Sequence, residues 1–357
     1  MLVRIQGISE LQNQIYYDYD TDAVPLGQGG MGIVYPGRCF RVDNPNEYIE
    51  VAIKLMTDTS PDMIKRAMRE ASIQIDDPNL LRMYGFIPNM EPDPYTKEMR
   101  PKYYMVMERL DGVSLENLLD GVFCTKNGTD ISAARELYDL GMRDRTSFTL
   151  KIMNPILRGV NRLHQAGYIH RDLDPSNIMI TQSDEIKIID YGVCKPVSSG
   201  VTDTKLTQTG AIIGKVDYAA PELLTGDVSH HNFTTDIYAL GIMIYRLFVG
   251  NLPFTGDNTA VMKSHLTEAV PVENISDPII RKIVQKATSK AQEDRYQSVD
   301  DMLADMETCC IGTARADCGG PVRAHIGEDI PSHTSALSWI VPAVVGLAAG
   351  IAAAFIM

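Results

Sequence analysis

Three residues with oxygen-bearing side chains lie in polar stretches enclosed by apolar runs. Asp172 and Asn177 belong to the stretch Tyr168–Ile180 (YIHRDLDPSNIMI), and Asp190 follows the apolar run IKII. Phosphoryl transfer requires a carboxylate that orients the attacking hydroxyl group, together with Asp and Asn oxygens that bind Mg²⁺. A chance polar turn would supply one of these residues but would rarely supply all of them in this order. The pattern therefore indicates phosphoryl-transfer chemistry.

A glycine-rich segment precedes these residues in the chain. Leu26–Tyr35 (LGQGGMGIVY) has glycines at positions 27, 29 and 32 between two runs that favour strands. Glycine lets backbone N–H groups approach phosphate oxygens without a side chain in the way. Such hairpins are common, so the segment alone is a weak signal. It is not a Walker A loop, because it lacks the Gly-Lys-Ser/Thr ending and a strand follows it.

Lys54 lies inside the apolar run Val51–Lys54 (VAIK). A lysine in an apolar strand is costly to bury unless it has an anionic partner. Two partners fit the sequence, namely nucleotide phosphates and Glu70 on the following helix. The alternative is a surface lysine on an edge strand.

The region around the glycine-rich segment has a β-rich character. Residues 23–107 alternate short β-rich runs with turns, and the runs Gly32–Tyr35 and Tyr48–Leu55 predict strands. A helix near Asp62–Ile75 interrupts this pattern. The N-terminal part of the chain is therefore expected to form a small lobe built on a β-sheet.

Helical periodicity dominates from Leu115 onward. Apolar residues recur at spacings of three and four, as in Thr149–Gln165 and Thr235–Phe248, which predicts helices. Residues 120–146 are interpreted as a polar insertion between helices. A larger helical lobe is therefore expected to follow the β-rich one.

Composition excludes some classes of function. The chain has 357 residues, and 33 Lys and Arg against 46 Asp and Glu give a net charge of −13 at pH 7. A protein that coats nucleic acid through attraction to phosphates is therefore not expected, and we predict no nucleic-acid partner. The six cysteines form no CxxC pair or His/Cys ligand spacing, so a zinc site has no support either.

The C-terminal stretch carries no charged residue after Asp329. Its last 22 residues, Ala336–Met357, would form a helix of about 33 Å, enough to cross a hydrocarbon core of about 30 Å. This predicts a transmembrane helix, although a buried terminal helix is the alternative. Residues 309–335 are interpreted as a flexible tether. The N-terminus does not resemble a secretory signal, so the body is expected on the cytoplasmic side of the membrane as part of a single-pass protein.

Small residues recur along the predicted span. Gly346, Gly350 and Ala354 would share one helix face suited to close helix packing, which weakly favours a homodimer.

The motifs together resemble the eukaryotic-like (Hanks-type) serine/threonine protein kinase family, and most closely its bacterial membrane-anchored members. Six motifs occur in the order of that family. They are the glycine-rich loop, VAIK, the helix glutamate Glu70, HRD with its asparagine, DYG in place of DFG, and Ala220-Pro-Glu222.

The resemblance implies an α+β, two-lobed protein kinase fold with a small β-rich N-lobe and a larger helical C-lobe. The kinase domain would cover residues 23–308, with the N-lobe at about 23–107 and the C-lobe at about 112–308. Residues 1–22 would form an N-terminal extension.

The resemblance also implies roles for individual residues. Lys54 would hold the ATP phosphates and pair with Glu70, Asp172 would orient the substrate hydroxyl, and Glu222 would pair with Arg295. Asn177 and Asp190 would bind Mg²⁺. ATP would be bound by Leu26, Gly27, Gln28, Gly29, Gly30, Met31, Gly32, Val34, Ala52, Lys54, Glu70, Met107, Glu108 and Leu110.

Two positions depart from the family pattern. Asp174 stands where these kinases usually have a lysine, and Lys215 stands where they usually have a threonine. One hypothesis is that Lys215 supplies the missing charge near the transferred phosphate and is a catalytic residue held by Asp174. The alternative is that both changes are drift and mark reduced activity.

Arg171, next to Asp172, suggests regulation by phosphorylation. A phosphate of about −2 charge on the activation segment would pair with this arginine, and Thr207 and Thr209 are the first candidates.

The sequence therefore predicts a protein kinase that transfers the γ-phosphate of ATP to Ser or Thr hydroxyls of protein substrates. It would phosphorylate its own activation segment. One alternative is a membrane-anchored pseudokinase that binds nucleotide and partners without catalysis. A small-molecule phosphotransferase of related fold is the other alternative, and Ala220-Pro-Glu222 and Arg295 argue against it.

Overall fold

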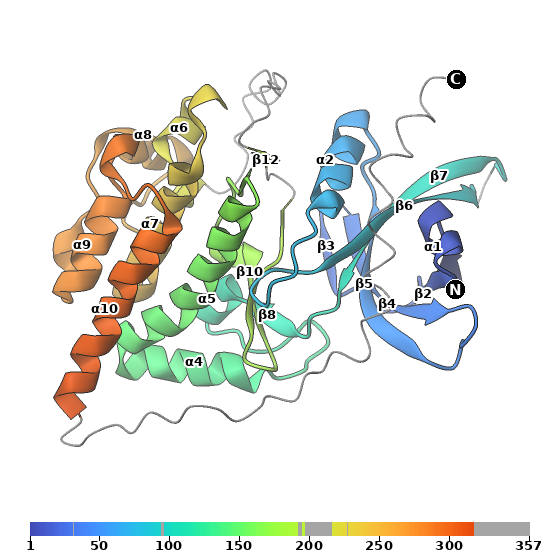
Figure 1. Ribbon diagram of the computed structural model, residues 1–357, viewed down its shortest axis with the longest axis horizontal. Helices are drawn as coiled ribbons and strands as arrows, with labels where there is room; N and C mark the ends of the chain where they lie inside the picture. Colours follow the sequence, from blue (N-terminus) through green and yellow to red (C-terminus); the bar gives the residue numbers. More distant parts are fainter. Residues whose placement is uncertain (31, 94–95, 192–194, 197–215, 227, 318–357) are drawn as a thin grey trace. The chain divides into compact units, whose positions relative to one another are not determined.

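The computed structural model describes residues 1–30, 32–93, 96–191, 195–196, 216–226 and 228–317. The chain forms two compact units. The first unit comprises Met1–Gln74 and Arg82–Leu110, and the second comprises Ile75–Leu81 and the described residues from Asp111 onward. The first is β-rich and the second largely helical, so the predicted pair of lobes is confirmed (Figure 1).

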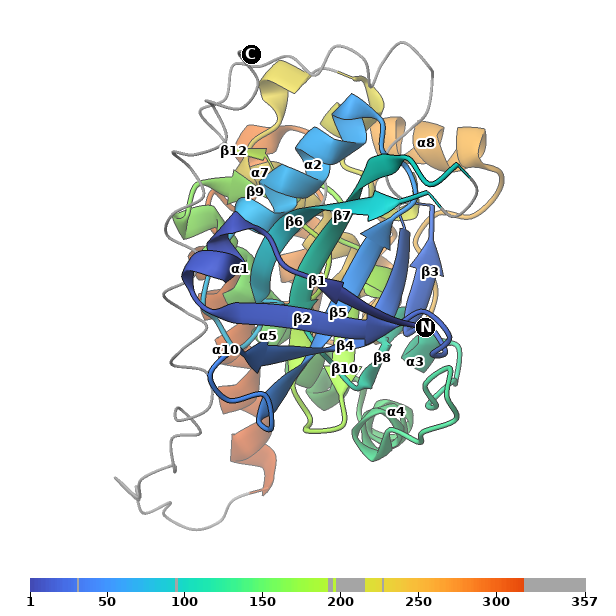
Figure 2. The ribbon, with the colours of Figure 1, turned by 90° about the vertical axis from the view of Figure 1, so that its right-hand side faces the viewer.

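The first unit is built on an antiparallel sheet with the strand order β1-β2-β4-β5-β7-β6, in which β3 also pairs with β4 (Figure 2). The strands are β1 Leu2–Ile5, β2 Ile15–Asp20, β3 Gly27–Gly29, β4 Gly32–Arg41, β5 Tyr48–Met56, β6 Met83–Pro92 and β7 Met99–Glu108. Two helices, α1 Ile8–Gln12 and α2 Pro61–Ser72, complete the unit.

Side-chain alternation gives this sheet two different faces. One face carries an apolar core that includes Ile5, Tyr17, Ile53, Tyr104 and Val106. Because successive residues of a strand point to opposite faces, the residues between them face the other way. The segment predicted as an N-terminal extension supplies β1, α1 and β2, and thus belongs to this sheet.

The second unit contains mainly helices. They are α3 Leu115–Leu119, α4 Ser132–Arg143, α5 Arg145–Gln165, α6 Pro221–Leu224, α7 Phe233–Val249, α8 Asn258–Thr267, α9 Pro278–Ala287 and α10 Val299–Asp317. Short strands accompany them: β8 Gly112–Ser114, β10 Ile178–Thr181 and β11 Ile186–Ile188 form one sheet, and β9 Tyr168–Ile169 pairs with β12 Lys195–Pro196.

Helix α7 is apolar on all sides and is almost wholly buried. Its N-terminus has a capping box, in which the Asn232 side chain accepts from a backbone N–H and the Thr235 hydroxyl accepts from the Asn232 N–H. Its C-terminus ends at Gly250, whose φ of 93° lies in the left-handed region that favours glycine. The predicted helices Thr149–Gln165 and Thr235–Phe248 are confirmed as parts of α5 and α7.

Two predicted segments differ from the structure. Residues 120–146 are not only a polar insertion, because α4 lies within them and buries Ala133, Ala134, Leu137 and Gly141. These residues are mostly small, so their helical spacing was concealed by the polar residues around them. Helix α10 continues to Asp317, so residues 309–317 of the predicted tether are helical.

No helix within the described residues is both long enough and apolar enough to cross a membrane. The predicted span, residues 336–357, and the remaining tether residues 318–335 lie outside the described part of the chain.

Candidate active site

Asp236, at the beginning of α7, holds the backbone of the loop that contains Asp172. Its side chain is only 1% exposed. Its Oδ2 accepts a hydrogen bond from the His170 N–H at 2.8 Å, and its Oδ1 accepts one from the Arg171 N–H at 2.8 Å. The His164 Nε2 of α5 lies 2.7 Å from Oδ2. The carboxylate therefore fixes the chain immediately before Asp172.

Burial acts to raise the pKa of Asp236, but hydrogen bonding and attraction from His164, together with these N–H groups, more than offset it. The net result is a lowered pKa, so the carboxylate stays ionised. An ionised oxygen makes each of these hydrogen bonds stronger than a neutral acceptor would.

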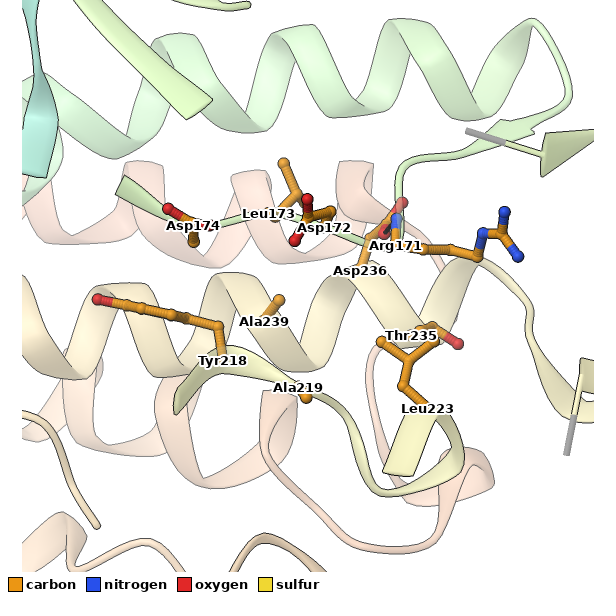
Figure 3. Close-up of a pocket in the computed structure, with 10 residues that line it drawn as sticks. All are labelled: Arg171, Asp172, Leu173, Asp174, Tyr218, Ala219, Leu223, Thr235, Asp236 and Ala239. Carbon is orange, nitrogen blue, oxygen red and sulfur yellow. Dashed lines mark hydrogen bonds between the residues drawn. The ribbon is translucent and has the colours of Figure 1, made fainter. Parts of the chain in front are cut away.

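Arg171 has a left-handed backbone with φ of 67°. A residue with a side chain adopts this conformation at a cost, and it persists only where the surroundings impose it. The hydrogen bond from its N–H to Asp236 supplies that constraint. The Arg171 side chain extends away from the other residues of the loop in Figure 3, and the predicted phosphorylation sites Thr207 and Thr209 lie outside the described residues.

Asn177 lies beside Asp172 as predicted. Its Nδ2 donates to the Asp172 carbonyl oxygen at 2.8 Å, which turns its Oδ1 away from this contact. The Asn177 carbonyl oxygen accepts from the Ile189 N–H at 2.9 Å. This bond places the residue before Asp190 against Asn177, so the two predicted metal ligands come from adjoining backbone segments.

This donor set fits a divalent cation that also binds nucleotide phosphates. One carboxylate and one amide oxygen leave most coordination positions to phosphate and water, which is how proteins commonly hold Mg²⁺. In the described part of the chain, no group of three or more His, Cys, Asp or Glu residues is arranged to hold a metal by itself.

Asp174 is 4% exposed and is used inside its own loop. Its Oδ1 accepts hydrogen bonds from the Ser176 N–H at 2.6 Å and from the Ser176 hydroxyl at 2.5 Å. The side chain thereby caps the 3₁₀ turn Pro175–Asn177. Lys215, its predicted partner, lies outside the described residues, so the charge exchange between them stays a prediction.

A small pocket lies between this loop and the segment that follows residue 215 (Figure 3). Tyr218, Ala219 and Leu223 line one side, and the loop residues Arg171–Asp174 line the other. The Tyr218 hydroxyl accepts from Arg246 at 2.6 Å, which fixes the ring in the pocket wall. The pocket therefore brings Asp172 near the segment that leads into Ala220-Pro-Glu222.

Glu222 and Arg295 form the ion pair that the sequence predicts. Nη1 and Nη2 of Arg295 donate to the two carboxylate oxygens of Glu222, and the Thr235 hydroxyl donates to Oε1 at 2.8 Å. Arg295 also donates to the Thr234 carbonyl oxygen at 2.9 Å. The end of the segment is thus fastened to α7.

The first unit places several predicted nucleotide-binding residues on one face of its sheet. Val34 pairs with Lys54 across β4 and β5, and Ala52 pairs with Met107 across β5 and β7. Cross-strand partners face the same side of a sheet, and so do residues two apart. These four side chains therefore share the face opposite the apolar core. The Leu26 N–H donates to the Val34 carbonyl oxygen at 2.8 Å and holds Leu26 next to them.

The glycine-rich hairpin combines β3 with the start of β4. A Cβ atom at Gly32 would lie 2.3 Å from the Leu55 carbonyl oxygen, so only glycine fits there. A Cβ at Gly27, Gly29 or Gly30 would meet no atom within 4 Å, which leaves open space over the hairpin. Gln28 is exposed, and the predicted contact residue Met31 lies outside the described residues.

Lys54 and Glu70, the predicted ion pair, lie near each other in the structure. Both line one small cavity, together with Arg66 and Ala67 of α2. Arg66 lies one helical turn before Glu70 and brings a second cation to the cavity. Both predicted anionic partners of Lys54, nucleotide phosphates and Glu70, stay predictions.

The last predicted nucleotide contacts lie where the first unit ends. The Glu108 N–H donates to the Arg82 carbonyl oxygen at 2.9 Å, and the Glu108 Oε2 accepts from the Arg82 N–H at 3.3 Å. Leu110 is the last residue of the unit.

Sequence reasoning missed His164 and Arg246, which support Asp236 and Tyr218. His164 is a buried polar residue of α5, and Arg246 lies in the last turn of the apolar helix α7. A polar residue on an otherwise buried helix face is the signal that could have identified both.

Comparison with known proteins agrees with this arrangement. A family model described as a protein kinase domain matches residues 21–311. The probable serine/threonine-protein kinase PknB of Lactococcus lactis is 30% identical over 294 residues, which cover 79% of this chain and 40% of that protein. The serine/threonine-protein kinase PrkC of Bacillus subtilis is 31% identical over 293 residues, 79% of this chain and 39% of that protein.

A third relative, the serine/threonine-protein kinase PknE of Mycobacterium bovis, is 30% identical over 288 residues, 78% of this chain and 44% of that protein. The chain thus spans less than half the length of these relatives. The match extends over the motifs of both units. On the strength of the family model, the relatives and the geometry of its loop, the chain belongs to the protein kinase family.

Proposed function

We propose that the protein is an ATP-dependent serine/threonine kinase that acts on protein substrates. The observation that carries the proposal is the fixed arrangement of Asp172, Asn177 and the chain before Asp190. Asp236 and the two hydrogen bonds of Asn177 maintain this arrangement. The relatives named as serine/threonine-protein kinases support the choice of Ser and Thr as acceptors.

Each of these residues would have one task in the reaction. Asp172 would accept a hydrogen bond from the acceptor hydroxyl and orient its oxygen for in-line attack on the γ-phosphorus. Lys54 would hold the phosphates in position. Asn177 and Asp190 would hold Mg²⁺, which, when bound, offsets the charge that develops on the phosphate oxygens.

We further propose that the protein is anchored in a membrane and that phosphorylation regulates its activity. The uncharged stretch 336–357 would anchor the protein in a membrane, with the kinase domain on the cytoplasmic side. The small residues Gly346 and Gly350 would favour a homodimer. Phosphorylation of Thr207 or Thr209 within such a dimer would create a partner for Arg171.

A pseudokinase scaffold is the alternative that the sequence left open. Lys54, Asp172, Asn177 and Asp190 all have the residue types that catalysis needs, and no structural observation favours this alternative. The two functions differ in whether phosphate is transferred.

Incubation of the full chain with Mg²⁺ and ATP, followed by mapping of phosphosites by mass spectrometry, distinguishes them. Wild-type protein should gain phosphate on Ser or Thr residues, whereas Asp172→Asn should gain none. Asp184→Asn removes an exposed carboxylate from a nearby turn and is the matched control that should keep activity. Absence of incorporation with both Mg²⁺ and Mn²⁺ would refute the proposal.

A further inference from the structure

A series of three hydrogen bonds in the second unit connects four residues. None of these residues belongs to the kinase motifs described above. The Lys290 Nζ lies 3.0 Å from the Tyr238 hydroxyl, and that hydroxyl lies 2.9 Å from the His265 Nδ1. The His265 Nε2 lies 3.0 Å from the Asp217 carbonyl oxygen. The series thus runs from the loop after α9, through α7 and α8, to the segment before Tyr218.

Hydrogen-bond chemistry fixes the direction of this series. A backbone carbonyl oxygen can only accept, so His265 must carry its proton on Nε2. A neutral imidazole then accepts through Nδ1, which makes the Tyr238 hydroxyl a donor. Because the Lys290 ammonium can only donate, it satisfies the remaining acceptor position of that hydroxyl. Every group has a partner only when His265 is neutral.

The surroundings keep His265 neutral. Its side chain is fully buried, and the Phe254 ring meets it edge-on with centroids 5.0 Å apart. Burial, and next the positive charge of Lys290, lower the pKa of His265 to about 4, although the Asp217 carbonyl oxygen opposes this shift. The imidazole therefore remains an Nε2–H donor throughout the physiological pH range.

The last acceptor of these hydrogen bonds, the Asp217 carbonyl oxygen, lies next to the pocket that Asp172 lines. Asp217 belongs to the 3₁₀ turn Val216–Tyr218, and the next residues, Tyr218 and Ala219, face Asp172 across the pocket of Figure 3. Tyr218 is held from the other side by Arg246. The turn is thus anchored through one backbone carbonyl and one side chain, and the conformation of the pocket wall depends on both anchors.

We propose that His265 is a positioning residue that fixes the turn Val216–Tyr218 for binding of the acceptor peptide, and that Tyr238 and Lys290 hold its imidazole in the required tautomer. The inference rests on the proposed kinase function. His265 touches no reacting atom, so its effect should appear in acceptor binding and not in ATP binding.

Several charged and titratable groups surround the imidazole and set its proton affinity. Tyr238 hydrogen-bonds to the imidazole, and the positive charge of Lys290 lowers its pKa. Arg295 lies over the Tyr238 ring, 5.0 Å from its centroid. The negative charge of Glu222 acts to raise the pKa of Tyr238, and the negative charge of Glu268, at the end of α8, acts to raise the pKa of Lys290. Among these groups, Lys290 is the one whose removal should most directly raise the pKa of His265.

Steady-state kinetics of the full chain, with dephosphorylated casein as the acceptor probe, test the positioning role. His265→Phe keeps a ring but loses both hydrogen bonds, and it should raise KM for casein about tenfold while KM for ATP changes less than about twofold. His265→Gln can still donate to the Asp217 carbonyl oxygen and should restore KM for casein to within about threefold of wild type. Lys263→Met, on the exposed side of the same helix, is the control that should change neither constant.

NMR titration of the seven histidines gives a readout that does not depend on activity. The His265 signal, identified by its absence in His265→Gln, should show a neutral Nε2–H imidazole down to a pH of about 4. Lys290→Met should raise the pKa of His265, because a nearby positive charge is removed.

The outcomes separate this inference from the proposed function. An unchanged KM for casein in folded His265→Phe, a parallel rise in both KM values, or titration of His265 near its ordinary pKa would each overturn the positioning role. If the wild-type chain phosphorylates neither casein nor itself, the kinase function fails first, and the positioning role fails with it.

Discussion

Arg295 donates hydrogen bonds to both carboxylate oxygens of Glu222, from Nη1 to Oε1 at 2.8 Å and from Nη2 to Oε2 at 3.0 Å. The pair is buried, so loss of either partner would leave a charge without compensation. We expect Glu222→Gln or Arg295→Met to lower the free energy of unfolding by about 3–5 kcal/mol. The double variant Glu222→Gln, Arg295→Met should cost clearly less than the sum of the two single changes. Urea unfolding followed by circular dichroism measures these values, and strictly additive losses would contradict the coupling.

Acidification should weaken the same pair. Burial tends to raise the pKa of Glu222, but hydrogen bonding and attraction from Arg295 prevail, and the folded-state pKa lies below the ordinary value of 4.5. The unfolded chain therefore binds a proton more readily than the folded one. The stability that the pair contributes is fully present above about pH 4.5 and is lost as the pH falls through the folded-state pKa. Unfolding measured from pH 7 to pH 3 should show this loss in wild type, and a flatter curve in Glu222→Gln.

Asp236→Asn should lower both the catalytic rate and the stability. The amide keeps the shape of the side chain but has one acceptor oxygen for the N–H groups of His170 and Arg171, so one bond is lost and the left-handed residue 171 loses support. We expect kcat to fall at least about tenfold, with a loss of about 1–3 kcal/mol in stability. Phosphate transfer and thermal unfolding of the same preparation measure both effects. A kcat equal to that of wild type would show that Asp236 does not position the loop.

The charge exchange between Asp174 and Lys215 can be tested by a double-mutant cycle. Asp174→Lys also removes the cap on Ser176, which should cost about 1 kcal/mol of stability. Lys215→Thr should lower kcat if its charge serves the transferred phosphate. The double variant restores the residue types usual in the family and should be more active than the worse single variant. A double variant no better than that single variant would end the exchange hypothesis.

The sequence was sufficient for features that depend on local order along the chain. Asp172 and Asn177 are five residues apart on one loop, so their proximity follows from the motif, and the structure confirms it. The alternation of β5 likewise predicted a strand in which Lys54 is enclosed by apolar residues. Such features depend on neighbours within a few positions.

Features that depend on the approach of distant elements were less accessible. Whether Lys54 meets Glu70 depends on how α2 turns on the sheet, and no local pattern specifies that rotation. The hydrogen bond between His265 of α8 and the Asp217 carbonyl oxygen joins residues 48 positions apart. Burial of α4 was missed because small residues such as Ala133 and Ala134 give a weak hydrophobic signal.

The N-terminal strand should contribute strongly to stability. Ile5 is fully buried in the apolar core of the sheet, whereas Leu2 on the same strand is 68% exposed. Ile5→Ala should lower the free energy of unfolding by about 2–5 kcal/mol, because it leaves a cavity. Leu2→Ala is the matched control and should change it by less than about 0.5 kcal/mol. Similar losses for the two variants would contradict the packing described for β1.

β1 also protects the protein from self-association. It pairs with β2 along Leu2–Ile5, and without it the backbone N–H and C=O groups of β2 would form an open edge, a template for strands of other molecules. β1 also carries Arg4, which pairs with Asp18 of β2 and stacks on Tyr16, and a charged residue on an edge strand disfavours the addition of another strand. Removal of the first residues, and with them β1, would therefore make the protein prone to aggregate even though its catalytic loop is unchanged.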